Sequence, residues 1–510
     1  MKKYFFRFVL LLRSAAVDFV LTFDFTQEDK SAMARNITPR EQDYSQWYLD
    51  IIKVAELADY APVRGCMVVR PTGYAIWEDL QAKFDRAFKE TGHVNAYFPL
   101  LIPASFLRKE AEHVEGFAPE CAVVTHAGGE ELEEPLVIRP TSETVIGAMY
   151  SKWVQSWRDL PLLINQWANV LRWEKRPRLF LRTSEFLWQE GHTAHATAAE
   201  AEEETVKMLN VYAKIMKEDM ALPVVEGVKS EGERFPGALD TYTCETMVSD
   251  TKALQAGTSH FLGQNFARAF NIQFQDQNGE MQYAWTTSWG VSTRMIGAII
   301  MTHSDNDGLI LPPRVAPVKA VIVPISKDDA AFAELDAKAR ELADELNNVL
   351  GPLTVRVDEQ NHMRPADRFF YHLQRGVPLR LELGEKDAAA GTVRAVRRDT
   401  GAREDLKWGE LAERVPAILE DIQKSLYEKA CAFRDANTYE ASSYDELKAR
   451  LEKGGWVKCF FAGSKEDEKK IKEETQATVR CYPLAEKDRT GKCVYTGKEG
   501  AHLAVFAKSY

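Results

Sequence analysis

Polar and apolar residues alternate with a period of two between Leu162 and His192, which is the repeat of a β-strand with two different faces. A basic loop containing a proline, Lys175–Leu179, interrupts the alternation near its middle. The pattern therefore predicts an antiparallel hairpin with one polar, aromatic and cationic face. That face carries Arg172 and Glu174 before the loop, and Arg182, Phe186, Trp188, Glu190 and His192 after it.

The side chains on this face predict a binding surface. The simpler alternative is a solvated face with two incidental aromatic rings, since most hairpins bury one face and leave the other in water. Guanidinium groups, however, bind anionic oxygens in a forked geometry, and aromatic rings stack on bases. A carboxylate and an imidazole can order the remaining polar groups. We therefore expect a site for a small zwitterion and a polyphosphate.

The chain before the hairpin is predicted to form two helices and a strand. The first helix covers Thr38–Leu57 with Thr38 as its cap, and the second runs from about Tyr74 to Glu90. Val94–Leu100 is expected to be a strand closed by prolines. A long helix that runs into such a strand suits a subunit interface, but simple core packing would produce the same pattern.

Residues 136–143 read as a strand that runs into a polar turn. Thr141 and Glu143 place a hydroxyl and a carboxylate within two residues of each other, as a ligand site would need. The alternative is that Ser142 or Thr141 caps the following helix, with Glu143 in its first turn. The two roles can coexist, and local sequence favours neither.

A helix is predicted over Ala198–Met220, and the segment Leu254–His260 follows it. Gln255, Thr258 and His260 flank a glycine there, and glycine permits close backbone approach to a ligand. A lone histidine of this kind is more often structural, so only its neighbours suggest a functional role.

Residues 283–303 read as a strand that breaks at Gly290 and a helix capped by Ser292 or Thr293. Arg294 lies in the first turn of that helix, where a cation opposes the helix dipole at a cost of about 0.3–1 kcal/mol. This cost indicates that Arg294 serves an anion or a stacked base. The alternative is an ion pair with a neighbouring carboxylate.

Beyond Pro312–Pro317 the pattern changes to alternating strands and helices, which predicts a small α/β domain from about Val318 to Ile422. Arg394, Arg397 and Arg398 form a basic corner of it, or else a salt-bridged surface. From about Cys431 the chain reads as two helices and several short strands. Cys459, Cys481 and Cys493 are too widely spaced for a four-cysteine zinc site.

Composition narrows the class of protein. The 510 residues suggest two to four domains, and the net charge of -11 argues against a protein that coats nucleic acid indiscriminately. Seven scattered cysteines fit a reducing compartment better than a disulfide scaffold. Arg7, Arg13 and Asp18 interrupt the apolar start of the chain, so we expect residues 1–32 to be a disordered extension outside the fold; a targeting segment is the weaker alternative.

Several of these segments together resemble the prolyl-tRNA synthetases of the archaeal/eukaryotic-like kind, which are class II aminoacyl-tRNA synthetases. The resemblance covers about Met33 to Tyr510. Gly73–Pro99 is similar to the first class II motif, VLRWE with LRTSEFLWQEGH to the second, and GVSTRMIGAII with LPPRVAP to the third. RPTSET and QAGTSHFLGQNF resemble segments specific to the proline enzymes.

The resemblance implies a fold class and a domain order. An α+β catalytic domain with an antiparallel sheet would occupy residues 33–316 and an α/β anticodon-binding domain residues 317–425. A small α/β C-terminal domain would fill residues 426–510. Some relatives hold zinc there with C-x4-C and C-x-C pairs; here those places read Cys459…Ser464 and Cys493…Tyr495, so no structural zinc is expected. Helix and strand patterns fill the segment between the second and third motifs, so no editing domain is expected.

The resemblance also implies a role for each matching residue. Arg172 and Arg294 would be the catalytic residues, in a reaction that needs ATP and Mg²⁺. ATP would contact Arg172, Glu174, Arg182, Phe186, Gln255, Thr258 and Arg294. Proline would be held by Thr141, Glu143, Arg172, Trp188, Glu190, His192, His260 and Ser292. Glu382 and Lys386 are the candidates for reading the anticodon.

The expected activity is therefore that of a proline–tRNA ligase, with L-proline, ATP and tRNA(Pro) as substrates. A cytoplasmic homodimer that does not enter a membrane is the implied setting. Two alternatives remain: a class II relative for another small amino acid, and a binding or regulatory protein that kept the fold and lost catalysis. The RPTSE and GTSH segments argue against the first, and the presence of both Arg172 and Arg294 argues against the second.

Overall fold

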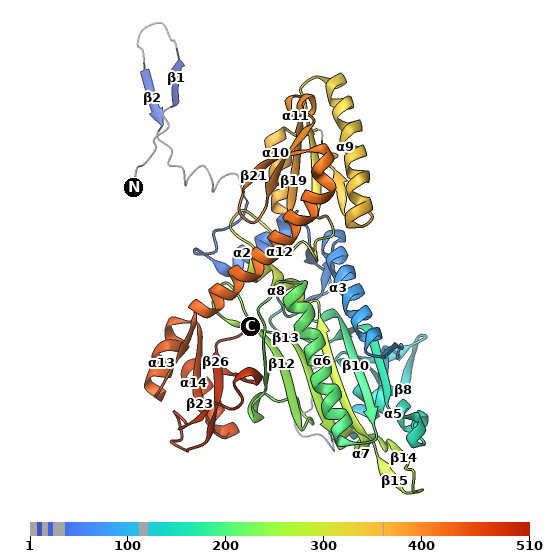
Figure 1. Ribbon diagram of the computed structural model, residues 1–510. Helices are drawn as coiled ribbons and strands as arrows, with labels where there is room; N and C mark the ends of the chain where they lie inside the picture. The colour runs from blue at the N-terminus through green and yellow to red at the C-terminus, as the bar shows by residue number, and fades with distance from the viewer. Residues whose placement is uncertain (1–7, 13–18, 24–35, 112–120, 361) are drawn as a thin grey trace.

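A computed structural model describes residues 8–12, 19–23, 36–111, 121–360 and 362–510 (Figure 1). Of the expected N-terminal extension it describes only β1 (Phe8–Leu12) and β2 (Phe19–Phe23), which pair with each other in an antiparallel hairpin. The expectation of disorder for the rest of residues 1–32 lies outside the described residues. From residue 36 onward the chain forms a large sheet, a middle α/β unit and a C-terminal unit.

The molecule is built on a twelve-stranded sheet in which antiparallel pairs predominate. In spatial order its strands are β22 (Thr438–Glu440), β23 (Trp456–Phe461), β26 (Ala501–Ala507), β24 (Thr478–Pro483), β11 (Val225–Val228), β12 (Asp240–Met247), β13 (Ala253–Gly263), β16 (Trp285–Ser292), β10 (Glu185–His195), β9 (Leu162–Leu171) and β5 (Val94–Asn95), with β25 (Thr490–Gly491) paired to β26. This architecture is the expected α+β class.

The predicted hairpin is present as β9 and β10, but it is shorter than expected. The strands pair from Leu162↔Ala194 to Leu171↔Glu185. Arg172, Glu174 and Arg182 were expected on the strands, and they lie instead in the connection that joins them. The connection contains Pro177, which offers no backbone N–H to a ladder, and Phe180, whose φ of 61° turns the chain.

Helices cover one face of the sheet. They are α2 (Tyr44–Val54), α3 (Pro71–Glu90), α6 (Ala198–Glu218) and α8 (Arg294–His303). Trp289 and Val291 of β16 point into the core beneath them and are almost fully buried. Because side chains alternate along a strand, Ser288, Gly290 and Ser292 face the opposite side of the sheet, away from the helices.

Two predicted boundaries before the hairpin were wrong. The first helix begins at Tyr44 rather than near Thr38, because the Asp43 carboxylate caps the N–H groups of Ser45 and Gln46. The expected strand over residues 94–100 is reduced to β5, Val94–Asn95. Its continuation leaves the ladder because the Phe98 N–H donates to the Gln166 side chain at 2.5 Å instead of to a strand.

The remaining elements of this region flank the sheet. They are β3 (Ala58–Tyr60), β4 (Met67–Val69), β6 (Leu101–Pro103), α4 (Ala104–Ala111), β7 (Val123–Ala127), β8 (Glu130–Ile138), α5 (Glu143–Trp153), η1 (Trp157–Asp159), η2 (Glu231–Glu233), α7 (Asn265–Phe270), β14 (Gln273–Gln275) and β15 (Met281–Tyr283). Of these, α5 matters most for function, because its first residues reach the open face of the sheet.

The middle unit matches the predicted α/β pattern and adds two elements to it. Its five strands, in spatial order, are β18 (Val355–Val357), β17 (Ala320–Ile325), β19 (Leu379–Gly384), β20 (Thr392–Arg397) and β21 (Arg403–Lys407). Its helices are α9 (Asp329–Leu350), α10 (Pro365–Gln374), α11 (Glu385–Ala390), η3 (Trp408–Glu410) and α12 (Leu411–Ala436). The patterns had not predicted α11 or β21, both of which are short.

The basic corner of the middle unit is a salt-bridged surface. Arg394 pairs with Asp405 at 2.9 Å, and Arg398 pairs with Asp305 at 2.7 Å. Arg397 pairs with Asp399 at 2.8 Å and also contacts Asp421. These arginines therefore have carboxylate partners, as expected if the corner is a salt-bridged surface.

The C-terminal unit continues both the middle unit and the large sheet. Helix α12 runs without a break across residues 425 and 426, where a domain boundary was expected, and reaches the C-terminal unit (Figure 1). That unit adds α13 (Tyr444–Lys453), α14 (Lys465–Thr475) and η4 (Leu484–Glu486) to its strands. Strand β24 pairs with β11 at Gly227↔Pro483 and Val228↔Tyr482, so the two sheets are one.

The joint between β11 and β24 requires a glycine. A Cβ atom on Gly227 would lie 2.5 Å from the Cβ of Cys481 and 2.8 Å from the carbonyl oxygen of Tyr482. Both are closer than real Cβ contacts, and one of them is backbone, which cannot move aside without shifting the strand. The two strands can therefore approach each other this closely only because residue 227 has no side chain.

We expect Gly227→Ala to lower the free energy of unfolding by roughly 1–3 kcal/mol, because the added methyl overpacks this joint. Thermal or urea unfolding of both proteins measures the difference. Gly409→Ala is the control, since a Cβ atom there would meet nothing within 4 Å. Equal destabilisation by the two substitutions would contradict this account of the joint.

Candidate functional site

A cavity of 440 Å³ opens on the face of the large sheet opposite the helices. Every residue that the sequence assigned to the ATP and proline sites lines it. These are Thr141, Glu143, Arg172, Glu174, Arg182, Phe186, Trp188, Glu190, His192, Gln255, Thr258, His260, Ser292 and Arg294. Residues from five separate segments thus converge on one place, although their individual roles stay a prediction.

The floor of the cavity is a set of rows across three neighbouring strands. One row joins Glu190 of β10, Gly290 of β16 and Thr258 of β13. The next row joins His192, Ser288 and His260. Because the register of an antiparallel sheet sets which side chains are neighbours, these rows fix the polar groups relative to one another.

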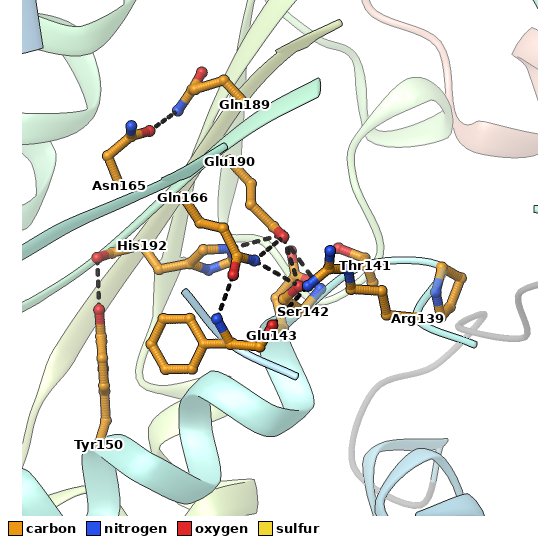
Figure 2. Close-up of polar contacts among 12 residues, drawn as sticks. Arg139, Thr141, Ser142, Glu143, Tyr150, Asn165, Gln166, Gln189, Glu190 and His192 are labelled. Carbon is orange, nitrogen blue, oxygen red and sulfur yellow. Dashed lines mark hydrogen bonds and ion pairs between the residues drawn. The ribbon is translucent and has the colours of Figure 1, made fainter. Parts of the chain in front are cut away.

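Glu190 is the centre of a buried hydrogen-bond network (Figure 2). Its carboxylate accepts hydrogen bonds from the Ser142 hydroxyl at 2.5 Å and the Gln166 amide at 2.8 Å. His192 Nε2 lies 3.0 Å from the same carboxylate. Burial opposes the ionisation of Glu190, but these donors outweigh it and hold its pKa below the ordinary value. The carboxylate therefore stays charged in the floor.

His192 is fixed by the same network. Burial works against its charged form, but the Glu190 carboxylate raises the pKa of His192 above its ordinary value. The Tyr150 hydroxyl of α5 donates to the backbone carbonyl of His192 at 2.8 Å. Glu190 and His192 therefore behave as a charge pair, with each group favouring the ionised form of the other.

The turn before α5 brings the predicted Thr141 and Glu143 to the edge of this network. Ser142 occupies the cap position of α5, but its hydroxyl donates to Glu190 and makes no capping bond. The Thr141 hydroxyl donates to the Glu143 carboxylate. Both hydroxyls of the turn therefore serve polar groups at the cavity rather than the orphan N–H groups of the helix.

Arg172 lies at the cavity with its guanidinium anchored to backbone. Its Nε donates to the carbonyl of Pro140 at 2.9 Å, and its guanidinium carbon lies 5.6 Å from the Phe186 ring centre and 5.3 Å from that of Trp188. Surrounding protein lowers the pKa of Arg172, although the charges of Glu143 and Glu190 oppose this. The guanidinium still faces the open cavity, where an anion can reach it.

Arg294, the first residue of α8, approaches the cavity from a different part of the sequence. Its guanidinium donates to the carbonyl oxygens of Leu181 at 3.2 Å and Gln255 at 3.5 Å. Burial, together with the positive charges of Arg172 and Arg182, lowers the pKa of Arg294 to about 10. Like charges at one cavity are a cost that a bound polyanion would remove.

Several polar atoms of the floor have no partner in the described part of the chain. Trp188 Nε1 and Ser288 Oγ are buried and accept or donate no hydrogen bond there. Buried polar groups are normally hydrogen-bonded, so atoms of this kind at a cavity indicate a polar ligand. Ser288 was not among the predicted residues, because it faces His192 across two paired strands and nothing in its own segment indicates that pairing.

The structure adds other residues that the sequence did not indicate. Gln166 and Ser142 orient Glu190. Ser142 lies in the RPTSET segment, but this role follows from turn geometry, as that of Gln166 follows from strand pairing. Thr241 Oγ1 lies 3.0 Å from His260 Nδ1, and the Phe235 ring lies 4.5 Å from the His260 ring. Burial, assisted by the charge of His192, lowers the pKa of His260 to about 3, so His260 is neutral near pH 7.

Glu382 and Lys386, the two candidates for anticodon reading, lie in the middle unit and not at this cavity. Glu382 of β19 accepts from the Arg380 guanidinium at 2.8 Å, and Arg380 lies over the Phe369 ring at 4.4 Å. Lys386 is exposed in α11. Their assignment stays a prediction.

Within the described residues there is no group of three or more histidine, cysteine, aspartate or glutamate side chains placed to hold a metal ion. Cys459 and Cys493 are buried in the C-terminal core. Burial raises the pKa of the Cys459 thiol to about 12. The Cys493 sulfur accepts the N–H groups of Ala462 and Thr496, each at 3.3 Å. In the same described part of the chain, no helix is long and apolar enough to cross a membrane.

Three family descriptions match consecutive parts of the chain. The class II tRNA synthetase core domain shared by the glycine, histidine, proline, serine and threonine enzymes matches residues 124–303. An anticodon binding domain matches residues 319–418, and the C-terminal domain of prolyl-tRNA synthetase matches residues 444–510. The cavity described above falls within the first match.

The chain is also similar over almost its whole length to proteins named proline–tRNA ligase. It is 57% identical over 479 residues to that of Roseiflexus sp. strain RS-1, covering 93% of this chain and 99% of the relative. It is 54% identical over 486 residues to that of Prosthecochloris aestuarii, covering 94% and 100%. For Chloroflexus aurantiacus the identity is 55% over 479 residues, covering 93% and 99%.

The coupling between Glu190 and His192 can be measured directly. We expect Glu190→Gln to lower the pKa of His192, because the amide keeps the shape but removes the negative charge. NMR titration of ¹³C-labelled histidine reports that pKa.

The pair also links the stability of the fold to pH. The stabilisation that charged His192 contributes is fully present below its unfolded pKa, near 6.5, and is lost as pH rises through the higher folded value.

The control for this titration is Glu185→Gln, which changes an exposed carboxylate at the start of the same strand. It should leave the His192 pKa unchanged. If His192 titrates alike in the wild type and in Glu190→Gln, the charge pair is not what holds the floor together.

Proposed function

The chain belongs to the prolyl-tRNA synthetases, and from that membership we propose that its cavity joins L-proline to ATP and then passes proline to tRNA(Pro). It is a proline–tRNA ligase, an ATP-dependent aminoacyl-tRNA ligase of class II. In the first step a proline carboxylate oxygen attacks the α-phosphorus of ATP and pyrophosphate leaves. In the second, the ribose hydroxyl of the terminal adenosine of tRNA attacks the prolyl carbonyl and AMP leaves.

The observation that carries this proposal is the convergence of Arg172 and Arg294 on one cavity. Arg172 binds the α-phosphate and the proline carboxylate, so it neutralises the two anions that must approach each other. It also stabilises the extra negative charge of the pentacovalent transition state. Arg294 and Arg182 bind the outer phosphates and direct pyrophosphate away from the reacting centre. No protein side chain needs to act as a nucleophile, because positioning and charge neutralisation suffice.

Proline is bound at the end of the cavity formed by α5 and the floor. Thr141 and Glu143 accept the two N–H bonds of the secondary ammonium, and Glu143 is buried beside them. Trp188, Glu190, His192, His260 and Ser292 surround the pyrrolidine ring. A pocket that fits the pyrrolidine ring closely excludes amino acids with larger side chains. It rejects smaller ones such as alanine by only about 1–3 kcal/mol.

ATP lies along the connection between β9 and β10. Phe186 stacks on adenine opposite the Arg294 guanidinium, and Glu174 orients the base, with its carboxylate 3.4 Å from Arg182. Gln255 and Thr258 contact the nucleotide from β13. Mg²⁺ takes few protein oxygens when phosphates are present, and the Gln255 amide with the Glu174 carboxylate fits that donor set. Held there, Mg²⁺ would supply charge neutralisation to the phosphates.

The middle unit is the part that reads the anticodon, as its family match indicates. We assign Glu382 and Lys386 to that recognition because unpaired bases are read by hydrogen bonds to their edges and by stacking. The substitution Lys386→Ala should raise the KM for tRNA(Pro) in the aminoacylation assay. It should leave the rate of the first step unchanged, because that step does not need tRNA.

The proposal extends to the assembly and its setting. A homodimer is supported by exposed apolar side chains around the β5 edge of the large sheet, where Val94 is 60%, Tyr97 70% and Trp153 43% exposed. Light scattering should find twice the chain mass of 57.8 kDa. A cytoplasmic location is supported by the free thiols of Cys66, Cys244, Cys431, Cys459, Cys481 and Cys493, and cell fractionation tests it.

Three finer points also belong to the proposal. The catalytic domain is assigned to residues 33–316, the anticodon-binding domain to 317–425 and the C-terminal domain to 426–510. Limited proteolysis should cut near residues 316 and 317, whereas the limit at residues 425 and 426 lies inside the unbroken helix α12. The C-terminal domain holds no structural zinc, because Cys459 and Cys493 are packed as core residues; metal analysis should find well under one zinc per chain. The chain carries no editing domain, so added alanyl-tRNA(Pro) should not be hydrolysed.

Pyrophosphate exchange into ATP tests the activity itself. Exchange should be most efficient with L-proline and weaker by about 10–200-fold with a smaller amino acid such as alanine. Exchange with a different amino acid but not with proline would assign the site to that substrate, and no exchange would leave only a binding role. Arg172→Ala should reduce proline-dependent exchange by at least about 100-fold, since one charged donor at a transition state contributes that much.

The matched control is Arg176→Ala, in the same connection but outside the cavity lining. It should keep exchange within about twofold of the wild type, and circular dichroism should show both variants folded. Undiminished exchange by Arg172→Ala would refute the role of this guanidinium.

A further inference from the structure

One wall of the cavity comes from a segment that the C-terminal unit touches from the other side. Residues 229–236 form this wall segment, and Glu233, Arg234, Phe235 and Pro236 line the cavity. The Phe235 N–H donates to Thr241 Oγ1 at 3.0 Å, and that hydroxyl lies 3.0 Å from His260 Nδ1. The wall segment therefore bears directly on the proline end of the floor.

The first contact from the C-terminal unit is Glu468 of α14. Its carboxylate accepts a hydrogen bond from the Ser230 hydroxyl at 2.6 Å and a longer one from the Gly232 N–H at 3.4 Å. A Cβ atom on Gly232 would lie 2.7 Å from that carboxylate, so the wall segment and α14 are in close contact. Ser230 is itself buried, which makes its hydroxyl dependent on this partner.

The second contact is Arg480 of β24. Its guanidinium donates to the fully buried Glu245 carboxylate at 2.9 and 3.0 Å, and Lys229, the first residue of the wall segment, reaches the same carboxylate at 2.7 Å. Arg480 also lies 3.9 Å from Glu233, which lines the cavity. The start of the wall segment, at Lys229, and its middle, at Glu233, are thus tied to one buried charge cluster.

We propose that Glu468 and Arg480 are positioning residues for proline, because they hold the wall segment against His260 from the C-terminal unit. The C-terminal unit then contributes to substrate binding although it supplies no atom to the cavity lining. The inference rests on the proposed function, since it names the substrate whose pocket the wall closes. It predicts an effect on the KM for proline that is separate from kcat and from the KM for ATP.

Glu468 is the better residue to test. Removing Arg480 would leave Glu245 buried with one cation fewer, and a buried charge that loses a partner destabilises the whole fold. Glu468 lies at the edge of the contact, so its loss should release the wall segment without unfolding the protein. Ser230→Ala removes the other partner of the same hydrogen bond and gives an independent second variant.

The experiment measures proline-dependent pyrophosphate exchange with the full chain, varying proline and ATP in turn. Glu468→Ala should raise the KM for proline about three- to tenfold, the equivalent of about one hydrogen bond, with kcat and the KM for ATP within about twofold. Glu468→Gln keeps an acceptor oxygen and should restore the KM for proline to near the wild-type value. Ser230→Ala should match Glu468→Ala, and the double variant should add little to either.

Glu473→Ala is the matched control, because Glu473 is an exposed carboxylate on the same helix. It should leave every kinetic constant unchanged. If the wild type shows no proline-dependent exchange, the proposed function fails and this inference with it. If the wild type exchanges proline but Glu468→Ala and Ser230→Ala keep its KM, or lower kcat and melting temperature together without moving that KM, this inference alone is overturned.

Discussion

The site depends on holding two guanidinium groups at one cavity against their mutual repulsion. Arg172 leaves the end of β9 and is anchored by the Pro140 carbonyl, whereas Arg294 begins α8 and is anchored by the carbonyls of Leu181 and Gln255. Neutral carbonyl oxygens fix the geometry of a guanidinium without cancelling its charge. The two guanidinium groups therefore keep charge and N–H donors for a ligand at the cavity, and a triphosphate is a ligand that such donors favour.

A rigid floor makes this positioning useful for chemistry. The rows Glu190–Gly290–Thr258 and His192–Ser288–His260 cross three strands whose register admits no slippage without turning every side chain to the helix face. Beside Glu190, Ser142 and Gln166 donate hydrogen bonds to its carboxylate, so the charged group does not need to move to find partners. A reaction that needs placement and charge neutralisation rather than a protein nucleophile is well served by such a surface.

The C-terminal unit is more closely joined to the catalytic sheet than a separate domain would be. It shares the sheet through β11 and β24, it is reached by the unbroken helix α12, and it buries Arg480 against Glu245. Its core packs Cys459 and Cys493 with aromatic and aliphatic side chains. Packing and a shared sheet are thus the interactions that hold this unit, and they bring its residues within reach of the wall of the cavity.

The local patterns determined a large part of the site. Alternation along β10 placed Trp188, Glu190 and His192 on one face, and the helix dipole argument singled out Arg294; both led to residues that line the cavity. The patterns did less well at element ends, where Asp43 rather than Thr38 begins α2 and where the β9–β10 connection takes Arg172 and Arg182 off the strands. At these places one side chain or one turn outweighs periodicity, which averages over many residues.

Only the tertiary structure decided which distant residues meet. No local pattern predicted which groups are contacted by Ser142, Gln166, Thr241 and Phe235, because their partners lie on other strands and in other turns. The hydrogen bond between Ser230 and Glu468 joins one residue that precedes the middle unit in the sequence to one that follows it. The sequence by itself determined the chemistry available on each segment through short-range periodicity and residue type, whereas strand register and long-range packing decided which of those groups share a cavity.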